Sequence, residues 1–209
     1  MRASSSVVEH LSYTQNVRGP IPLWPTMKLP SKAQKVFQGK IFSVYQWEQE
    51  LYDGTTATFE MLKRPGTIQI IPTNAEKIYL SYEEQPTKPR TITFFGGRQE
   101  PDEDPLVTAK RELLEETGME SDDWELLKKY DYEGKIEWPM YLFTARNCKK
   151  VAEQNLDPGE KIDIKEVTFD QFLDIVSAES FWGGIIANDI LRMRLDKEKL
   201  EEFKKKLFK

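Results

Sequence analysis

The stretch GGRQEPDEDPLVTAKRELLEETGM, residues 96–119, constrains the fold most because it specifies a helix whose two ends are both marked. Asp104 is a favourable N-cap, and Pro105 stands at the first helical position, where an N–H would have no helical partner. Gly118 can adopt the left-handed conformation that commonly ends a helix. The pattern therefore predicts a helix from about Pro105 to Thr117.

The predicted helix has one apolar side and one acidic side. Residues three or four positions apart share a face of a helix. The apolar arc consists of Leu106, Ala109, Leu113 and Leu114. The acidic side consists of Glu112, Glu115 and Glu116, with Arg111 at its edge and Glu103 just before the helix.

The acidic side is compatible with a solvated surface or with a metal site. Like charges at these spacings repel each other by a few tenths of a kcal/mol per pair. Glu115 and Glu116 also lie toward the C-terminal end, where the helix dipole disfavours negative charge. A divalent cation would relieve both effects, because carboxylate oxygens are the ligands that hard cations prefer. The residues alone leave the two readings open.

The composition excludes several other kinds of site. His10 is the only histidine in 209 residues, so catalytic triads and His-rich zinc sites have little support. The net charge of −5 gives no reason to expect a nucleic-acid polymer or an anionic membrane as partner. Cys148 is the only cysteine, so an internal disulfide is excluded and a reducing compartment is expected. No apolar run approaches the ~20 residues of a membrane span, and no secretory leader is recognisable, so we expect a cytoplasmic protein.

Short β-branched and aromatic runs surround the predicted helix. Residues 36–51 are predicted to form one strand, and further strands follow in 55–66, 67–73, 77–85 and 90–95. We expect 1–26 to be a flexible tail, or a segment ahead of a true start at Met27. We expect 27–209 to be one domain with a strand-rich part at about 36–72 and C-terminal helices at about 169–207. Many strands with one central helix and a helical end predict a mixed-sheet α/β or α+β domain.

The acidic segment resembles the signature of a known family. Gly97, Glu103, Arg111-Glu112-Leu113, Glu115-Glu116 and Gly118-Met119 have the identities and spacing of the Nudix box of the Nudix hydrolases. The resemblance implies an α/β/α sandwich around a mixed sheet, with the box as a loop-helix-loop and here an N-terminal extension of β-strands. It also implies hydrolysis of a nucleoside diphosphate linked to a further group.

The resemblance assigns roles to the residues of the box. Glu112, Glu115 and Glu116 would be ligands of Mg²⁺, for which Mn²⁺ can substitute. Glu103 and the carbonyl of Gly96 are further candidate ligands. Arg111 would orient a carboxylate by charge-assisted hydrogen bonds.

Residues 36–176 also resemble the ADP-ribose pyrophosphatase group within this family. This resemblance implies a nucleoside diphosphate sugar as substrate and suggests Glu160, in the sequence DPGEKI, as the general base. It is compatible with a homodimer. The chain departs from the group at residues 84–86 and 93–97, which the resemblance links to the substrate pocket and the dimer contact.

Substrate contacts can be suggested from residue type. Phe42, Trp47 and Trp138 could stack on a nucleobase, although each could equally be a core or surface aromatic. Arg64 and Arg98 could meet phosphates or be solvated. Two other functions stay open: a hydrolase of nucleoside triphosphates or dinucleoside polyphosphates, and a nucleotide-sensing module without activity.

Overall fold

The computed structural model describes residues 28–132 and 134–209, so the expectation for the segment 1–26 lies outside the described residues. A six-stranded mixed sheet forms the centre of the described part. Its strands follow the order β12-β5-β4-β10-β8, and β6 pairs with β5. The strands are β4 (Thr67–Asn74), β5 (Lys77–Gln85), β6 (Lys88–Thr93), β8 (Asp123–Asp131), β10 (Pro139–Arg146) and β12 (Lys161–Val167).

The two central strands, β4 and β10, run parallel to each other. Both are almost continuously apolar in their sequences, IQIIP and MYLFTA, and almost continuously buried. Such runs are typical of strands that are covered on both faces. The remaining pairings of this sheet are antiparallel, which makes the sheet mixed as predicted.

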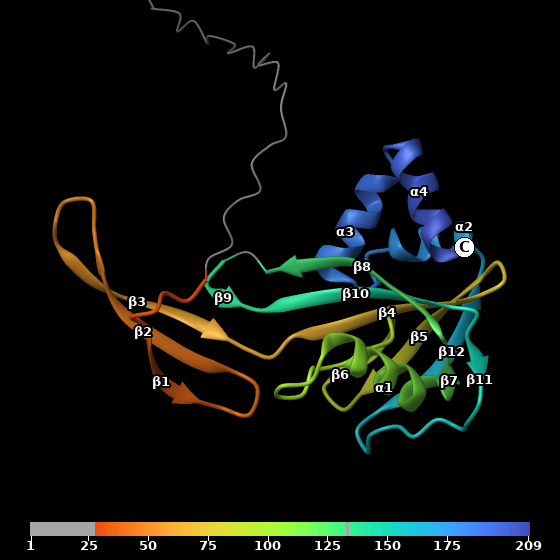
Figure 1. Cartoon of the computed structure of the whole chain (residues 1–209), viewed down its shortest axis with the longest axis horizontal. Coiled ribbons are helices and arrows are strands. Elements are labelled where there is room, and N and C mark those ends of the chain that lie inside the picture. The colour runs from red at the N-terminus through yellow and green to blue at the C-terminus, as the bar shows by residue number, and fades with distance from the viewer. Residues whose placement is uncertain (1–27, 133) are drawn as a thin grey trace, which may run out of the picture.

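Helices cover both faces of the sheet (Figure 1). Helix α1 (Pro105–Thr117) lies on one face, and α2 (Phe169–Val176), α3 (Gly184–Met193) and α4 (Lys197–Leu207) lie on the other. Each face has its own apolar core: Leu113 and Phe95 belong to the core under α1, and Phe172 and Ile186 to the core under α2–α4. The α/β/α sandwich predicted from the sequence is confirmed. None of the described helices is long and apolar enough to cross a membrane.

Helix α1 begins and ends at the residues predicted from its sequence. The Asp104 side chain accepts a hydrogen bond from the Leu106 N–H at 2.8 Å, and Pro105 is the first helical residue. Gly118 has a φ of 69°, the left-handed conformation that ends the helix. The apolar arc is fully buried at Ala109 and Leu113, which fixes α1 against the sheet and turns its acidic side to the adjoining loop.

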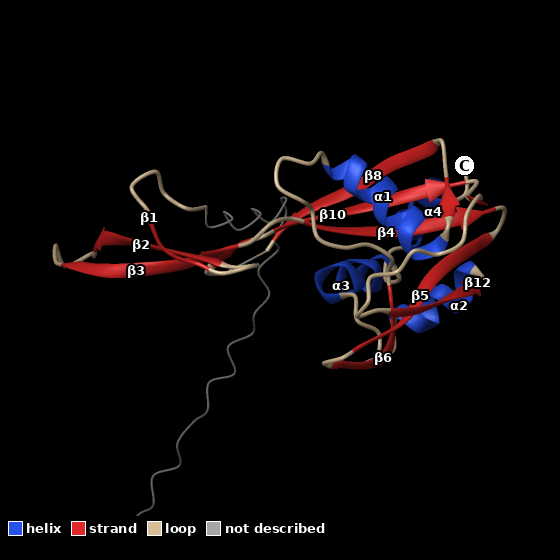
Figure 2. Ribbon diagram, turned by 90° about the horizontal axis from the view of Figure 1, so that it is seen from below, coloured by secondary structure: helices blue, strands red, loops and turns tan. Residues whose placement is uncertain are grey.

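A second, four-stranded sheet extends away from the sandwich (Figures 1 and 2). It consists of β1 (Gln34–Gln38), β2 (Ser43–Glu50), β3 (Thr56–Lys63) and the short β9 (Ile136–Glu137). The prediction of one strand over 36–51 is wrong, because the chain turns between β1 and β2, where the Gly39 N–H donates to the Phe42 carbonyl at 2.8 Å. A short antiparallel pair consists of β7 (Met119–Glu120), directly after α1, and β11 (Lys149–Lys150), after β10.

Candidate active site

The loop before α1 holds the innermost carboxylate of the acidic side. The Gly96 N–H donates a hydrogen bond to Glu116 Oε2 at 2.7 Å, and Glu116 is only 4% exposed. A Cβ on Gly97 would overlap the Glu112 carboxylate, so only glycine allows this close approach. The reading of this face as an ordinary solvated surface is therefore wrong for Glu116.

Arg111 holds the other carboxylates of the acidic side. Its Nη1 lies 2.9 Å from Glu112 Oε1 and 2.9 Å from Glu115 Oε2, and its Nη2 lies 3.3 Å from Glu103 Oε2. Thr108, fully buried on α1, also donates to Glu103 Oε2 at 2.7 Å. These contacts hold the carboxylate of Glu103 against the first half of the helix.

Two of these carboxyl groups have a raised pKa, so they keep a proton to higher pH than an ordinary glutamate does. Burial raises the pKa of Glu112 to about 7, although Arg111 opposes the shift. Burial also raises the pKa of Glu116 well above its ordinary value, and the charges of Glu112 and Glu160 raise it further. A negative charge at Glu116 is thus costly as the side chains stand, since its only hydrogen-bond donor among the described residues is the Gly96 N–H.

The donor chemistry of this cluster fits a hard divalent cation. Carboxylate oxygens are the preferred ligands of Mg²⁺, and a cation would offset the burial of Glu112 and Glu116. Within 28–132 and 134–209, no three acidic, His or Cys side chains are already gathered as a ready-made cage. Arg111 instead occupies Glu112 and Glu115.

Glu160 approaches the same cluster from the loop that precedes β12. Its N–H donates to the Asp157 carbonyl at 2.9 Å, which closes a tight turn. Burial, followed by the charge of Asp157, raises the pKa of Glu160. The charge of Glu160 in turn raises the pKa of Glu112 and Glu116, after burial and other neighbouring groups, so this predicted residue lies within electrostatic reach of the box carboxylates.

A second group of predicted residues meets at the junction with the extended sheet. The Arg64 guanidinium lies 4.3 Å from the centroid of Trp138 and 5.6 Å from that of Phe42. Thr67 Oγ1 accepts hydrogen bonds from Arg64 Nη2 at 3.3 Å and from Trp138 Nε1 at 2.9 Å. The Arg64 Nε is buried and has no hydrogen-bond partner among the described residues.

Arg98 connects this group to the acidic helix. It forms a β-bridge with Thr67, and its carbonyl accepts a hydrogen bond from Arg111 Nη2 at 3.5 Å. Burial and the charge of Arg98 lower the pKa of Arg64, as expected for two cations near each other. Such a pair favours the approach of an anion.

Trp47 does not join the other predicted substrate contacts. It is buried within the extended sheet, 6.0 Å from Phe59 between ring centroids, and its Nε1 donates to Gln49 at 3.1 Å. Its ring therefore contributes to the packing between β2 and β3.

Sequence reasoning missed the two threonines that organise these groups. Thr67 holds Arg64 and Trp138, and Thr108 holds Glu103. A threonine inside a helix, three residues before an Arg-Glu pair, is a weak signal for Thr108. Thr67 gives no signal, because its partner Trp138 is distant in the sequence.

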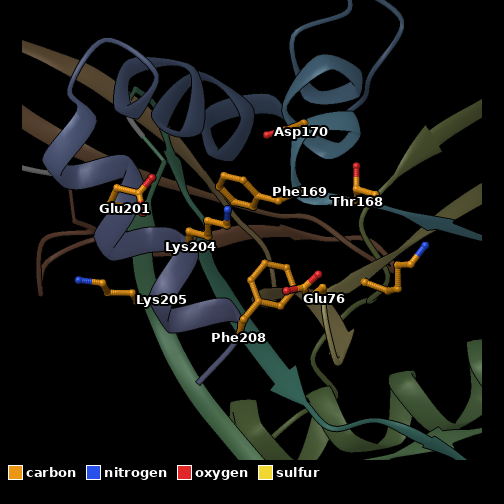
Figure 3. A pocket seen from close by; sticks show the side chains of 9 residues that line it. Glu76, Thr168, Phe169, Asp170, Glu201, Lys204, Lys205 and Phe208 are labelled. Carbon is orange, nitrogen blue, oxygen red and sulfur yellow. The ribbon is translucent and has the colours of Figure 1, made fainter.

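A hollow of about 460 Å³ lies on the other face of the sheet (Figure 3). Phe169 and Thr168 at the start of α2, Lys204 and Phe208 at the end of α4, and Glu76 in the β4–β5 turn line it. None of the site residues predicted from the sequence belongs to its lining.

Comparison with known families agrees with this arrangement. The NUDIX domain model matches residues 63–182, which include the acidic helix, Glu160, and Arg64, Arg98 and Trp138. The chain belongs to the Nudix hydrolase family, and is thus a hydrolase of phosphoric anhydride bonds.

Within the family, the predicted resemblance to ADP-ribose pyrophosphatases is confirmed. The chain is 29% identical over 172 residues to an ADP-ribose pyrophosphatase of Bacillus subtilis (strain 168), covering 80% of this chain and 92% of that protein. It is 30% identical over 169 residues to a methanol dehydrogenase activator of Bacillus methanolicus, covering 78% and 91% of the two chains. A crystal structure of an ADP compounds hydrolase has the same fold, with a TM-score of 0.64 at 21% identity, over 80% of this chain and 94% of that one.

Proposed function

We propose that this protein is a Mg²⁺-dependent pyrophosphohydrolase of ADP-ribose or a related nucleoside diphosphate sugar. The products would be a nucleoside monophosphate and a sugar phosphate. One observation carries the proposal: residues 96–98 join the acidic cluster directly to a group of two arginines and two aromatic rings. A metal site next to cations and aromatic faces suits a substrate with both a diphosphate and a base.

The acidic side would hold the metal. Glu112, Glu115 and Glu116 would ligate Mg²⁺, with Mn²⁺ able to substitute, and Glu103 and the Gly96 carbonyl are further candidate ligands. Bound there, the ion would neutralise the diphosphate, supply a water molecule and stabilise the departing phosphate oxygen. Arg111 would keep the carboxylates oriented while its own charge stays paired.

Glu160 is the proposed general base. Its carboxylate would take a proton from the attacking water, whose oxygen forms a bond to one phosphorus while the bond from that phosphorus to the bridging oxygen breaks. A base needs a pKa near the working pH, and the raised pKa of Glu160 moves it in that direction.

The arginine group would bind the nucleotide. Arg64 and Arg98 would meet the diphosphate, and Phe42 and Trp138, whose rings lie near the Arg64 guanidinium, would offer faces for the base. The buried Arg64 Nε, which lacks a partner among the described residues, would gain one from a phosphate oxygen.

The test is turnover of a panel of nucleotides by the wild type and two variants. ADP-ribose, other nucleoside diphosphate sugars, nucleoside triphosphates and dinucleoside polyphosphates would each be incubated with Mg²⁺ and the products resolved. We expect AMP and ribose 5-phosphate from ADP-ribose, loss of turnover in Glu116→Gln, and normal turnover in Glu120→Gln, an exposed glutamate close by. Turnover of triphosphates instead would replace the substrate, and binding without turnover would favour a sensor.

We further propose that the protein is a homodimer through the extended sheet. Phe37 on the edge strand β1 is 60% exposed, and Val36 beside it and Ile41 in the turn that follows are also exposed. Exposed apolar side chains next to each other at a sheet edge are typical of an interface. Light scattering should give twice the chain mass of 24.4 kDa, and Phe37→Asp should halve it; a monomeric wild type would refute the proposal.

A further inference from the structure

A second charged group, made of Glu83, Lys88 and Trp182, lies beside the acidic cluster. Lys88 on β6 forms an ion pair with Glu83 on the adjacent strand β5, and their side chains are only 15% and 11% exposed. Removing both charges from water has a substantial desolvation cost, so such a pair is weak evidence of a purely stabilising role. The pair therefore calls for another explanation.

Trp182 completes this group with a ring beside the Lys88 ammonium. Lys88 Nζ lies 3.8 Å from the centroid of the indole. The Trp182 N–H donates to the Ile92 carbonyl at 3.1 Å, and its carbonyl accepts from Thr93 Oγ1 at 2.7 Å, so its backbone is tied to β6. The residue is nevertheless 58% exposed. A rigid backbone that presents an exposed aromatic ring is suited to recognition.

The hairpin that carries Glu83 and Lys88 lies next to the loop of the proposed base. The charge of Glu83 raises the pKa of both Glu116 and Glu160, by less than burial and the charges of other neighbouring groups do. Pro86, in the turn between β5 and β6, packs 3.9 Å from the position of a Cβ on Gly159, next to Glu160. The β5–β6 hairpin thus borders the loop that carries the proposed base.

We propose that Glu83, Lys88 and Trp182 form a subsite for the sugar-phosphate half of the substrate. This inference rests on the proposed function. Sugar hydroxyls both donate and accept hydrogen bonds, and this group supplies a carboxylate acceptor and an ammonium donor side by side. The indole offers a flat apolar surface to the C–H face of a sugar ring.

The position of the group separates it from the nucleotide-binding residues. The chain runs from Lys88 along β6 and on to Arg98, and Gly96, which binds Glu116, lies between them. Arg64, Phe42 and Trp138 gather around Thr67, the bridge partner of Arg98. The carboxylates would accordingly meet the diphosphate, with the base on the Arg98 side and the sugar on the Lys88 side.

The test compares Lys88→Met and Trp182→Ala with the wild type on ADP-ribose. We expect kcat/KM to fall about ten- to a hundredfold, mainly through KM, as for the loss of a hydrogen bond to a charged group. Preference between ADP-ribose and its hypoxanthine analogue should stay unchanged, because the base would bind elsewhere. Lys128→Met is the matched control: Lys128 also pairs with a carboxylate and lies 4.7 Å over an aromatic ring, and we expect its kinetics to match the wild type.

A binding measurement separates this inference from the proposed function. Calorimetry should show that ribose 5-phosphate binds the wild type and the Lys128→Met control, and binds about tenfold or more weakly to the two subsite variants. If this holds while no nucleoside diphosphate sugar is cleaved, the subsite stands and the proposed function falls. If ADP-ribose is cleaved but Lys88→Met and Trp182→Ala behave as wild type, or alter only base preference, the subsite is refuted and the function stands.

Discussion

The buried carboxylates should make the metal-free protein less stable as the pH rises. Burial raises the pKa of Glu112 from 4.5 to about 7 in the folded protein. Between these values the folded protein keeps a proton that the unfolded chain has lost, so each rise in pH favours unfolding. The destabilisation is absent below the unfolded pKa and complete once the pH exceeds the folded pKa. Glu116 changes in the same direction.

The size of the effect follows from the shift of Glu112. A rise of the pKa from 4.5 to about 7 corresponds to about 3 to 4 kcal/mol, at about 1.4 kcal/mol for each step of one in pKa. The whole free energy of unfolding of a domain is only about 5–15 kcal/mol, so such a loss is easily measured. Binding of Mg²⁺ to the carboxylates should restore much of it, because the ion binds the folded form.

Urea denaturation at about pH 5.5 and about pH 8.5, with chelator or with Mg²⁺, checks this reasoning. With chelator we expect the free energy of unfolding to fall by about 2 kcal/mol on account of Glu112, the part of its effect that lies above about pH 5.5, and we expect Mg²⁺ to remove most of the fall. Glu112→Gln should be more stable than the wild type at the higher pH and should weaken the pH dependence. Every other titratable side chain, His10 included, is present in both proteins, so their difference reports Glu112 together with the effect of its charge on Glu116. Equal pH profiles for the wild type, Glu112→Gln and the control Glu120→Gln would refute the argument.

Three further substitutions test individual contacts. Arg64→Met should lower kcat/KM for ADP-ribose about tenfold or more while leaving the melting temperature nearly unchanged, because Arg64 is held away from water beside another arginine; steady-state kinetics and a thermal melt check this. Gly97→Ala should raise the Mg²⁺ concentration that gives half-maximal activity, because its Cβ would displace the Glu112 carboxylate; a metal titration shows this. Gly118→Ala should destabilise the protein by several kcal/mol in urea, because a Cβ would overlap the Ala152 carbonyl, whereas Gly54→Ala, also at positive φ but with no atom nearby, should cost about 1 kcal/mol.

The helix that carries the acidic residues was predictable because its information is local. Asp104, Pro105 and Gly118 set its ends by capping chemistry, and a period of three or four residues set its faces. The fold class followed from strand-like runs around one helix, and the Nudix box sharpened it. The helix ends therefore agree with the structure residue by residue.

The prediction of one strand over 36–51 is wrong for a reason that is also local. Residues 39–42 make a turn, but the apolar residues on both sides of Gly39 continue the strand-like pattern through it. Pattern alone favoured one long strand. Only the pairing of β1 with β2 shows that the chain reverses.

The composition of the site beyond the box depends on contacts between distant residues. The sequence offers Arg64 and Trp138 as separate candidate substrate contacts. Their stacking, and the hydrogen bonds of both to the Thr67 hydroxyl, depend on the fold. Lys88 and Trp182 meet because the segment after α2 hydrogen-bonds to β6. Contacts between residues so far apart cannot be predicted from periodicity or spacing in a single sequence.

The distribution of charge supports a metal ion in the middle of the proposed site and none at its ends. Near Glu116 the side chains are carboxylates, and Arg111 is already engaged by three of them. On one side of the middle lies Arg64, whose Nε has no hydrogen-bond partner among the described residues. On the other side lies Lys88, which forms an ion pair with one carboxylate, that of Glu83. An anionic diphosphate would be repelled from the middle unless cations came with it, whereas a base or a sugar could be held at either end without one. Binding of each half of the substrate should therefore survive chelation, while cleavage of the bond between the halves should not.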